Sequence, residues 1–120
     1  MKVLYLATSG SSDPTKASLP LHVAANGSVE AGQDCAVVLA GDATELVSRD
    51  TAERIEGVGV PPARELLQKL VDNAVPVYVC KGCAVARGAT DEDLAWLNAS
   101  WTTPPELARM IEQSDRVVSL

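Results

Sequence analysis

The chain has 120 residues and a mass of 12.6 kDa, enough for one domain, and 47% of its residues are hydrophobic, as in ordinary globular proteins. Its net charge of -6 and its pI of about 4.6 exclude a general binder of the nucleic-acid backbone, which needs a basic surface. No apolar stretch approaches the roughly 20 residues of a membrane span, and the N-terminal apolar run is too short for a signal peptide. We therefore expect a single, soluble, cytoplasmic domain over residues 1–120.

The first third of the chain predicts a strand, a helix and a second strand. Lys2–Ala7 is a short apolar run of β-favouring residues, bounded by a polar loop that contains glycine. A helix is expected over residues 13–31, because the segment opens on an Asp-Pro pair and closes at Gly32. Pro20 lies inside this helix and predicts a kink, since proline has no N–H to donate. Residues 35–40 predict a second buried strand.

The middle third contains the clearest helical pattern. Residues 43–49 predict a short helix, whereas residues 49–60 are ambiguous, and the glycines among them favour a loop. Pro61 and Pro62 then open a helix that Pro76 ends. Apolar residues recur along it at helical spacing and form one stripe, made of Ala63, Leu66, Leu67, Leu70, Val71 and Ala74. This stripe predicts that one face of the helix is buried.

The last third continues the alternation of strands and helices. Its predicted elements are a buried strand at 77–80, helical turns at 83–87, a short helix from Thr90, a short strand at 97–100, a helix after a capping box at 103–106, and a terminal strand at 116–120. Gly88 ends the helical turns. Leu107, Met110 and Ile111 give the last helix its apolar face.

The alternation of the elements determines the predicted fold class. The strands are continuously apolar rather than alternating, which is typical of a parallel sheet covered on both faces. We therefore predict an α/β fold with three α/β/α layers and a mostly parallel sheet of four to five strands, as in flavodoxin-like architectures. In such sheets, ligands bind beyond the carboxyl ends of the strands.

A pair of cysteines is the most chemically suggestive feature at that edge. Cys80 and Cys83 follow the third predicted strand, and Cys83 is expected at a helix N-terminus, whose partial positive charge favours a thiolate. The positive charges of Lys81 and Arg87 would also stabilise the thiolate. The pair predicts a functional thiol site, and the alternative is two small buried residues. Cys35 lies inside an apolar run and is expected in the core.

The loop after the first strand is a second candidate. Thr8, Ser9, Gly10 and Ser11 supply hydroxyl groups and a glycine in front of a helix. They are expected either to shape the cysteine pocket or to hold a phosphate. Asp42 follows the second strand at the same edge and is assigned to this pocket, with capping of the next helix as its other role.

His22 is the only histidine of the chain, so it bears both on general-base catalysis and on the number of possible metal ligands. His22 shares helical spacing with Ser18 and Asn26, and this polar stripe predicts a solvent or subunit-contact face. A general base for a cysteine is the alternative role of His22. One Cys-x-x-Cys and one histidine do not supply the four ligands of a structural zinc site, so we expect no metal, and we predict no cofactor.

Several segments carry a resemblance to known proteins: residues 8–17 (TSGSSDPTKA), residues 41–43, the start of the helix at Pro61, residues 80–88 (CKGCAVARG) and residues 114–118. In their order and spacing they resemble the DsrE/DsrF-like sulfur-relay family, including its YchN-like members, over nearly the whole chain. The resemblance implies a three-layer fold with a five-stranded parallel sheet. It also implies homo- or hetero-oligomers, commonly trimers or hexamers.

The resemblance further implies a cysteine that accepts a persulfide and hands it on. Sulfur-relay members carry it where Cys80 stands, and YchN-like members where Cys83 stands. The hypothesis is a small sulfur-handling protein, either a sulfurtransferase or a sulfur carrier, with a donor and an acceptor protein as partners. In it, Cys80 attacks as the thiolate, and Cys83 assists or forms a disulfide. A thiol-disulfide redox protein, and a nucleotide- or flavin-binding module built on the loop at residues 8–12, remain open as alternatives.

Overall fold

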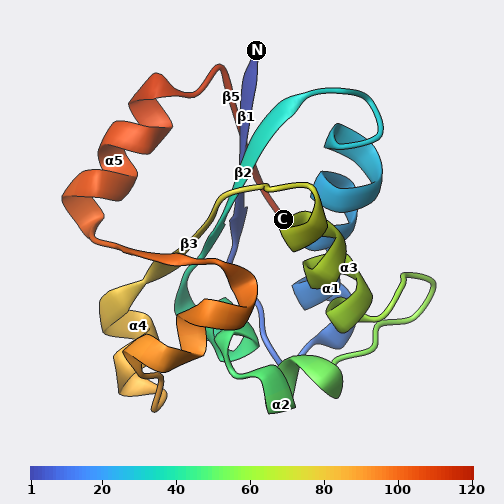
Figure 1. Ribbon diagram of the computed structural model, residues 1–120, viewed down its shortest axis with the longest axis vertical. Helices are drawn as coiled ribbons and strands as arrows, with labels where there is room; N and C mark the ends of the chain where they lie inside the picture. The colour runs from blue at the N-terminus through green and yellow to red at the C-terminus, as the bar shows by residue number, and fades with distance from the viewer.

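The computed structural model describes all 120 residues and contains one five-stranded sheet in which every strand is parallel to its neighbours (Figure 1). The strands are β1 (Lys2–Ala7), β2 (Asp34–Leu39), β3 (Val77–Cys80), β4 (Ser100–Thr102) and β5 (Arg116–Ser119). Their order across the sheet is β4-β3-β2-β1-β5. The predicted α/β class is confirmed, and the sheet is wholly parallel.

Helices cover both faces of this sheet. They are α1 (Pro14–Val23), the π-helical segment η1 (Ala24–Ser28), the 3₁₀ helix η2 (Gly41–Val47), α2 (Arg49–Glu53), α3 (Ala63–Asp72), α4 (Lys81–Ala86), the 3₁₀ helix η3 (Asp91–Leu97) and α5 (Pro104–Gln113). The chain adds β2, β3 and β4 in one direction and then returns to place β5 beside β1. Because crossovers between parallel strands are right-handed, the return puts α5 on the opposite face from α1 and α3 (Figure 1). No helix is long and apolar enough to cross a membrane.

The main core lies between the sheet and the helices α1 and α3. It contains 23 buried residues, most of them aliphatic. The apolar stripe predicted for the middle helix supplies four of them, namely Ala63, Leu66, Leu67 and Leu70. Ala74, the last member of the predicted stripe, lies beyond the end of α3 and has a positive φ of 56°. The stripe therefore buries one face of the helix as expected, over a shorter length.

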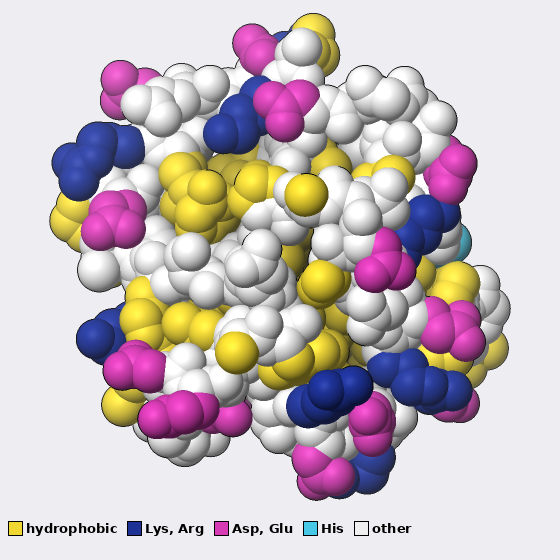
Figure 2. All heavy atoms as spheres, viewed as in Figure 1, with side chains coloured by type: hydrophobic (Ala, Val, Ile, Leu, Met, Phe, Trp, Pro, Cys, Tyr) yellow, Lys and Arg dark blue, Asp and Glu magenta, His cyan; other side chains and the backbone are white.

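The opposite face of the sheet is more thinly covered. Leu4, Ala36 and Val38 form a small buried cluster there, and α5 packs Leu107 and Met110 against it. Other apolar side chains on this side are only partly covered, and Figure 2 shows hydrophobic side chains reaching the surface beside α5. Ile111, which the sequence places on the apolar face of α5, is 42% exposed. One helix is thus too little to bury the second face.

The first helix differs from its prediction. It is α-helical only as far as Val23 and continues as the wider turn of η1, in which the N–H of Val29 donates to the carbonyl of Ala24 at 3.0 Å. The irregularity therefore falls after Pro20, in η1. The wide turn brings the hydroxyl of Ser28 to 2.6 Å from the buried hydroxyl of Tyr5, which gives both groups a partner.

Three smaller expectations are corrected. The strand predicted at residues 97–100 is β4, which begins at Ser100, because η3 extends to Leu97 and the next residue turns left-handed with φ 51°. Part of the ambiguous segment 49–60 forms α2, whose first turn is capped by the hydroxyl of Ser48. The capping box predicted at residues 103–106 is not formed, since the Thr103 side chain makes no capping hydrogen bond.

Candidate thiol site

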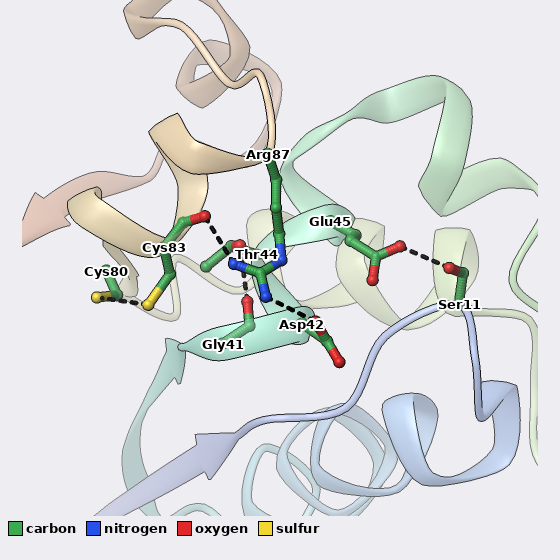
Figure 3. A network of polar contacts seen from close by, with 8 residues as sticks. All are labelled: Ser11, Gly41, Asp42, Thr44, Glu45, Cys80, Cys83 and Arg87. Carbon is green, nitrogen blue, oxygen red and sulfur yellow. Dashed lines mark hydrogen bonds and ion pairs between the residues drawn. The ribbon is translucent and has the colours of Figure 1, made fainter.

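Cys80 and Cys83 lie together at the carboxyl edge of the sheet, with their sulfur atoms 3.1 Å apart (Figure 3). Cys80 ends β3 and is the N-cap of α4, which begins at Lys81, two residues earlier than expected. Cys83 is therefore inside the first turn of the helix. Residues three apart at a helix start face the same side, which is why this spacing brings the two sulfurs into contact. Both side chains are half-buried.

The pKa values of the two thiols are shifted in opposite directions. The pKa of Cys83 is lowered, first by the hydrogen bond with Cys80 and then by the backbone N–H of Gly41, and the charge of Arg87 adds to this effect. The pKa of Cys80 is raised, first by its hydrogen bond with Cys83 and then by burial. Cys83 is therefore the thiol that ionises first, and the S–H of Cys80 then donates to its thiolate.

Arg87 ties the cysteine helix to the segment that follows β2. Its Nη1 donates to the carbonyl oxygen of Cys83 at 3.0 Å, and its Nη2 pairs with Oδ1 of Asp42 at 2.7 Å (Figure 3). The contact arises because β2 and β3 are neighbours, so that their carboxyl ends meet at the same place. Lys81, the other basic residue assigned to the thiolate, is exposed and makes no hydrogen bond or ion pair. Of these two basic residues, Arg87 is the one whose charge lowers the pKa of Cys83.

Gly41 provides the turn that aims a backbone amide at Cys83. Its φ is +55°, a left-handed conformation that costs other residues about 1–2 kcal/mol. The carbonyl oxygen of Gly41 accepts a hydrogen bond from the hydroxyl of buried Thr44 at 2.8 Å, and this bond stabilises the turn. Sequence reasoning missed both roles. The available signal was a glycine directly after a strand that neighbours the cysteine strand.

The loop after β1 packs closely against η2. A Cβ added to Gly10 would lie 2.3 Å from the carbonyl oxygen of Asp42, so only glycine fits there. The hydroxyl of Ser11 donates to Oε2 of Glu45 at 2.5 Å (Figure 3). These contacts hold η2, and with it Asp42, against the first loop.

The same loop does not form a cradle for a phosphate. The carboxylate of Asp13 caps the first turn of α1 and accepts the N–H of Lys16 at 3.1 Å. The side chains of Thr8 and Ser9 make no hydrogen bond, and the hydroxyl of Ser11 is taken by a carboxylate. Two carboxylates beside the loop oppose an anionic ligand. The geometry therefore gives the nucleotide or flavin alternative no support.

A polar groove of about 580 Å³ opens beside Arg87, and neither cysteine of the pair lines it. Its lining consists of Thr44, Glu45, Ser48, Thr51, Arg87, Gly88, Ala89 and Asp93. Only Arg87 among the predicted site residues lines it, since the first loop and Asp42 lie outside the lining. Arg87 is thus shared between the groove and the environment of Cys83.

The remaining candidates lie away from this edge. Cys35 is buried in β2, and burial raises its pKa, as expected for a core cysteine. His22 hydrogen-bonds with Asn26 at 3.0 Å on the surface of α1 and contacts neither cysteine of the pair. No group of three potential metal ligands occurs.

Comparison with known proteins gives one family and two similar structures. The model of the DsrE/DsrF-like family matches residues 1–120. The crystal structure of the ychN protein from E. coli is 21% identical, covers 100% of this chain and 99% of its own, and has a TM-score of 0.75. A conserved protein of unknown function from Bacteroides thetaiotaomicron is 15% identical over 99% of this chain and 94% of its own, with a TM-score of 0.72. No curated protein matches.

Proposed function

The chain belongs to the DsrE/DsrF-like family, and from this membership we propose that it accepts persulfide sulfur at the Cys80–Cys83 pair and passes it to an acceptor thiol. The family suggests a sulfur-relay role. The observation that carries the proposal is a half-buried thiol pair at the ligand-binding edge of the sheet in which one thiol has a lowered pKa. A sulfurtransferase would transfer sulfur to many acceptor molecules in turn, whereas a carrier would deliver the one sulfur atom with which it was loaded.

Loading is a single exchange at sulfur. The thiolate of Cys83 attacks the outer sulfur of a donor persulfide RS–SH, the donor S–S bond breaks, and RS⁻ leaves; the product is Cys83–S–SH. The lowered pKa of Cys83 supports this residue as the attacking thiol, whereas the resemblance to sulfur-relay members favours Cys80. We assign the first attack to Cys83, which exchanges the roles that the sequence suggested.

Delivery uses the same groups in reverse. An acceptor thiolate attacks the outer sulfur, and Cys83 leaves as a thiolate. The amide of Gly41 and the charge of Arg87 stabilise this leaving group, because they favour its ionised form. The outer sulfur has access to solvent, since the Cys83 side chain is half-buried at the open end of the sheet.

A thiol-disulfide redox protein is the second candidate, favoured by one observation. The sulfurs are 3.1 Å apart and both thiols are free, so that an oxidant forms a disulfide with little movement. In this function the pair cycles between dithiol and disulfide and carries no additional sulfur. The mass of the treated Cys80→Ser variant separates the two functions, because a relay adds one sulfur atom of about 32 Da to Cys83, whereas a redox cycle that needs both thiols does not.

We propose a protein donor, a protein acceptor and a homo-oligomer, a trimer or hexamer, as the partners of this chain. The thin cover over the second face of the sheet supports assembly, since α5 leaves apolar side chains there partly exposed (Figure 2). Light scattering at micromolar concentration tests it, and a mass near 12.6 kDa would contradict it.

The proposed function is tested by intact-mass spectrometry after treatment with a low-molecular-weight persulfide. The wild-type protein should gain about 32 Da, one sulfur atom, and Cys83→Ser should not. Cys35→Ala is the matched control, because this cysteine is buried in β2, and it should load like the wild type. If only Cys80→Ser loses loading, Cys80 is the accepting thiol. If neither Cys80→Ser nor Cys83→Ser changes the gain, the sulfur-carrier function is excluded at this site.

A further inference from the structure

In a simple carrier, the second sulfur of the pair would only donate a hydrogen bond to the first. A carrier needs one cysteine, and a neighbouring thiol is a hazard, because thiols attack persulfides. Yet Cys80 Sγ lies 3.1 Å from Cys83 Sγ, held there by the end of β3 and the first turn of α4. A persulfide on Cys83 therefore forms in contact with a second thiol of the same chain.

The contact selects which sulfur of the persulfide is attacked. After loading, Cys83 Sγ becomes the inner sulfur, and the added atom lies beyond it. Cys80 Sγ is already in contact with the inner sulfur, and an S–S bond of about 2.05 Å requires an approach of only about 1 Å from the observed 3.1 Å. An acceptor from solution meets the outer sulfur first. The geometry thus separates two reactions of the same loaded group.

We propose that the loaded pair releases its sulfur as sulfide when no acceptor takes it, a conclusion that rests on the proposed function. Cys80 first loses its proton to solvent, its thiolate attacks the inner sulfur, the bond between the inner and outer sulfur breaks, and HS⁻ leaves. The balance is Cys80–S⁻ + Cys83–S–SH → Cys80–S–S–Cys83 + HS⁻. The outer sulfur gains two electrons and becomes sulfide, and each cysteine sulfur loses one.

This step gives the chain a second activity, the reduction of alkyl persulfides to sulfide and thiol. In each cycle RS–SH loads Cys83, sulfide leaves, and a dithiol of the small-molecule or protein class reduces the disulfide back to the two thiols. No other redox partner is needed.

The experiment follows loading and release in one sample. The reduced, desalted protein is mixed with one equivalent of glutathione persulfide, and its intact mass and the free sulfide are measured over time. For the wild type, a species about 32 Da heavier should decay to one about 2 Da lighter than the reduced protein, with one equivalent of sulfide. Cys80→Ser should load, keep its sulfur, and release at least about tenfold less sulfide. Cys35→Ala should match the wild type.

The outcomes distinguish this inference from the proposed function. A wild-type protein that neither gains sulfur nor releases sulfide refutes both. A wild-type protein that loads and keeps its sulfur as long as Cys80→Ser does refutes only the release step. A loaded, long-lived Cys83→Ser in place of Cys80→Ser overturns the assignment of Cys80 as the resolving thiol. Glutathione persulfide incubated without protein gives the background release of sulfide.

Discussion

Replacement of Gly10 by alanine tests whether the first loop holds the site together. The new Cβ would lie 2.3 Å from the backbone oxygen of Asp42 and 2.5 Å from Oε1 of Glu45, whereas an ordinary contact begins at 3.4 Å. The oxygen of Asp42 would have to retreat by about 1.1 Å, the difference between 3.4 and 2.3 Å. Forced overpacking of this kind costs about 1–3 kcal/mol. Loss of glycine entropy in the unfolded chain offsets about 0.4–1 kcal/mol.

The net free energy of unfolding should fall by about 1–2 kcal/mol, and Tm by about 4–8 °C, measured by thermal denaturation. Gly82→Ala is the matched control, because its Cβ would meet no atom within 4 Å in α4. A helix gains about 0.5–1 kcal/mol from this change, so Tm should rise by about 2–4 °C. Equal stability of the Gly10→Ala and Gly82→Ala variants would refute the close packing of the first loop on η2.

Three further predictions concern the thiols. The rate of alkylation, measured against pH, should show that Cys83 reacts at a lower pH than an ordinary thiol, because its lowered pKa keeps it ionised. Arg87→Ala should raise the midpoint pH of this alkylation curve. The control Arg109→Ala, which changes an exposed arginine, should leave the midpoint pH unchanged. Gly41→Ala should lower the free energy of unfolding by about 1–2 kcal/mol in urea and slow alkylation of Cys83, because the strained turn no longer aims its amide. Peptide mapping of the folded protein should find Cys35 unlabelled, and labelling of Cys35 first would contradict its burial.

The fold was predictable because the strands are short, continuously apolar and separated by helix signals. The face of the sheet that each crossover helix covers follows from the strand order together with the right-handed crossover rule. The errors lie at boundaries that depend on contacts between distant segments. Ser28 joins the wide turn of η1 to Tyr5, and no local sequence pattern near residue 28 predicts that contact.

The site was predictable as a pair of cysteines but not as a ranked pair. Cys80 and Cys83 share the field of one helix N-terminus, so the local sequence gives no reason to prefer either. The largest cause of the difference in pKa is the hydrogen bond between the two thiols, and the amide of Gly41 and the charge of Arg87 lower the pKa of Cys83 further. Such a contribution from a neighbouring strand is visible only once the order of the strands is known.

The Asp42–Arg87 pair also limits how strongly the arginine lowers the pKa of Cys83. In the proposed relay, Cys83 attacks a donor in one step and leaves as a thiolate in the next. A very low pKa makes a thiol a good leaving group and a weak nucleophile, and a high pKa does the opposite, so the best attacking thiol has a pKa near the ambient pH. An unpaired arginine beside the thiolate would lower the pKa of Cys83 further. Arg87 is instead paired with Asp42 at 2.7 Å, and two neutral donors, the thiol of Cys80 and the amide of Gly41, lower the pKa of Cys83 more than the arginine does. In the proposed relay, Cys83 would therefore owe its ionisation chiefly to neutral hydrogen-bond donors.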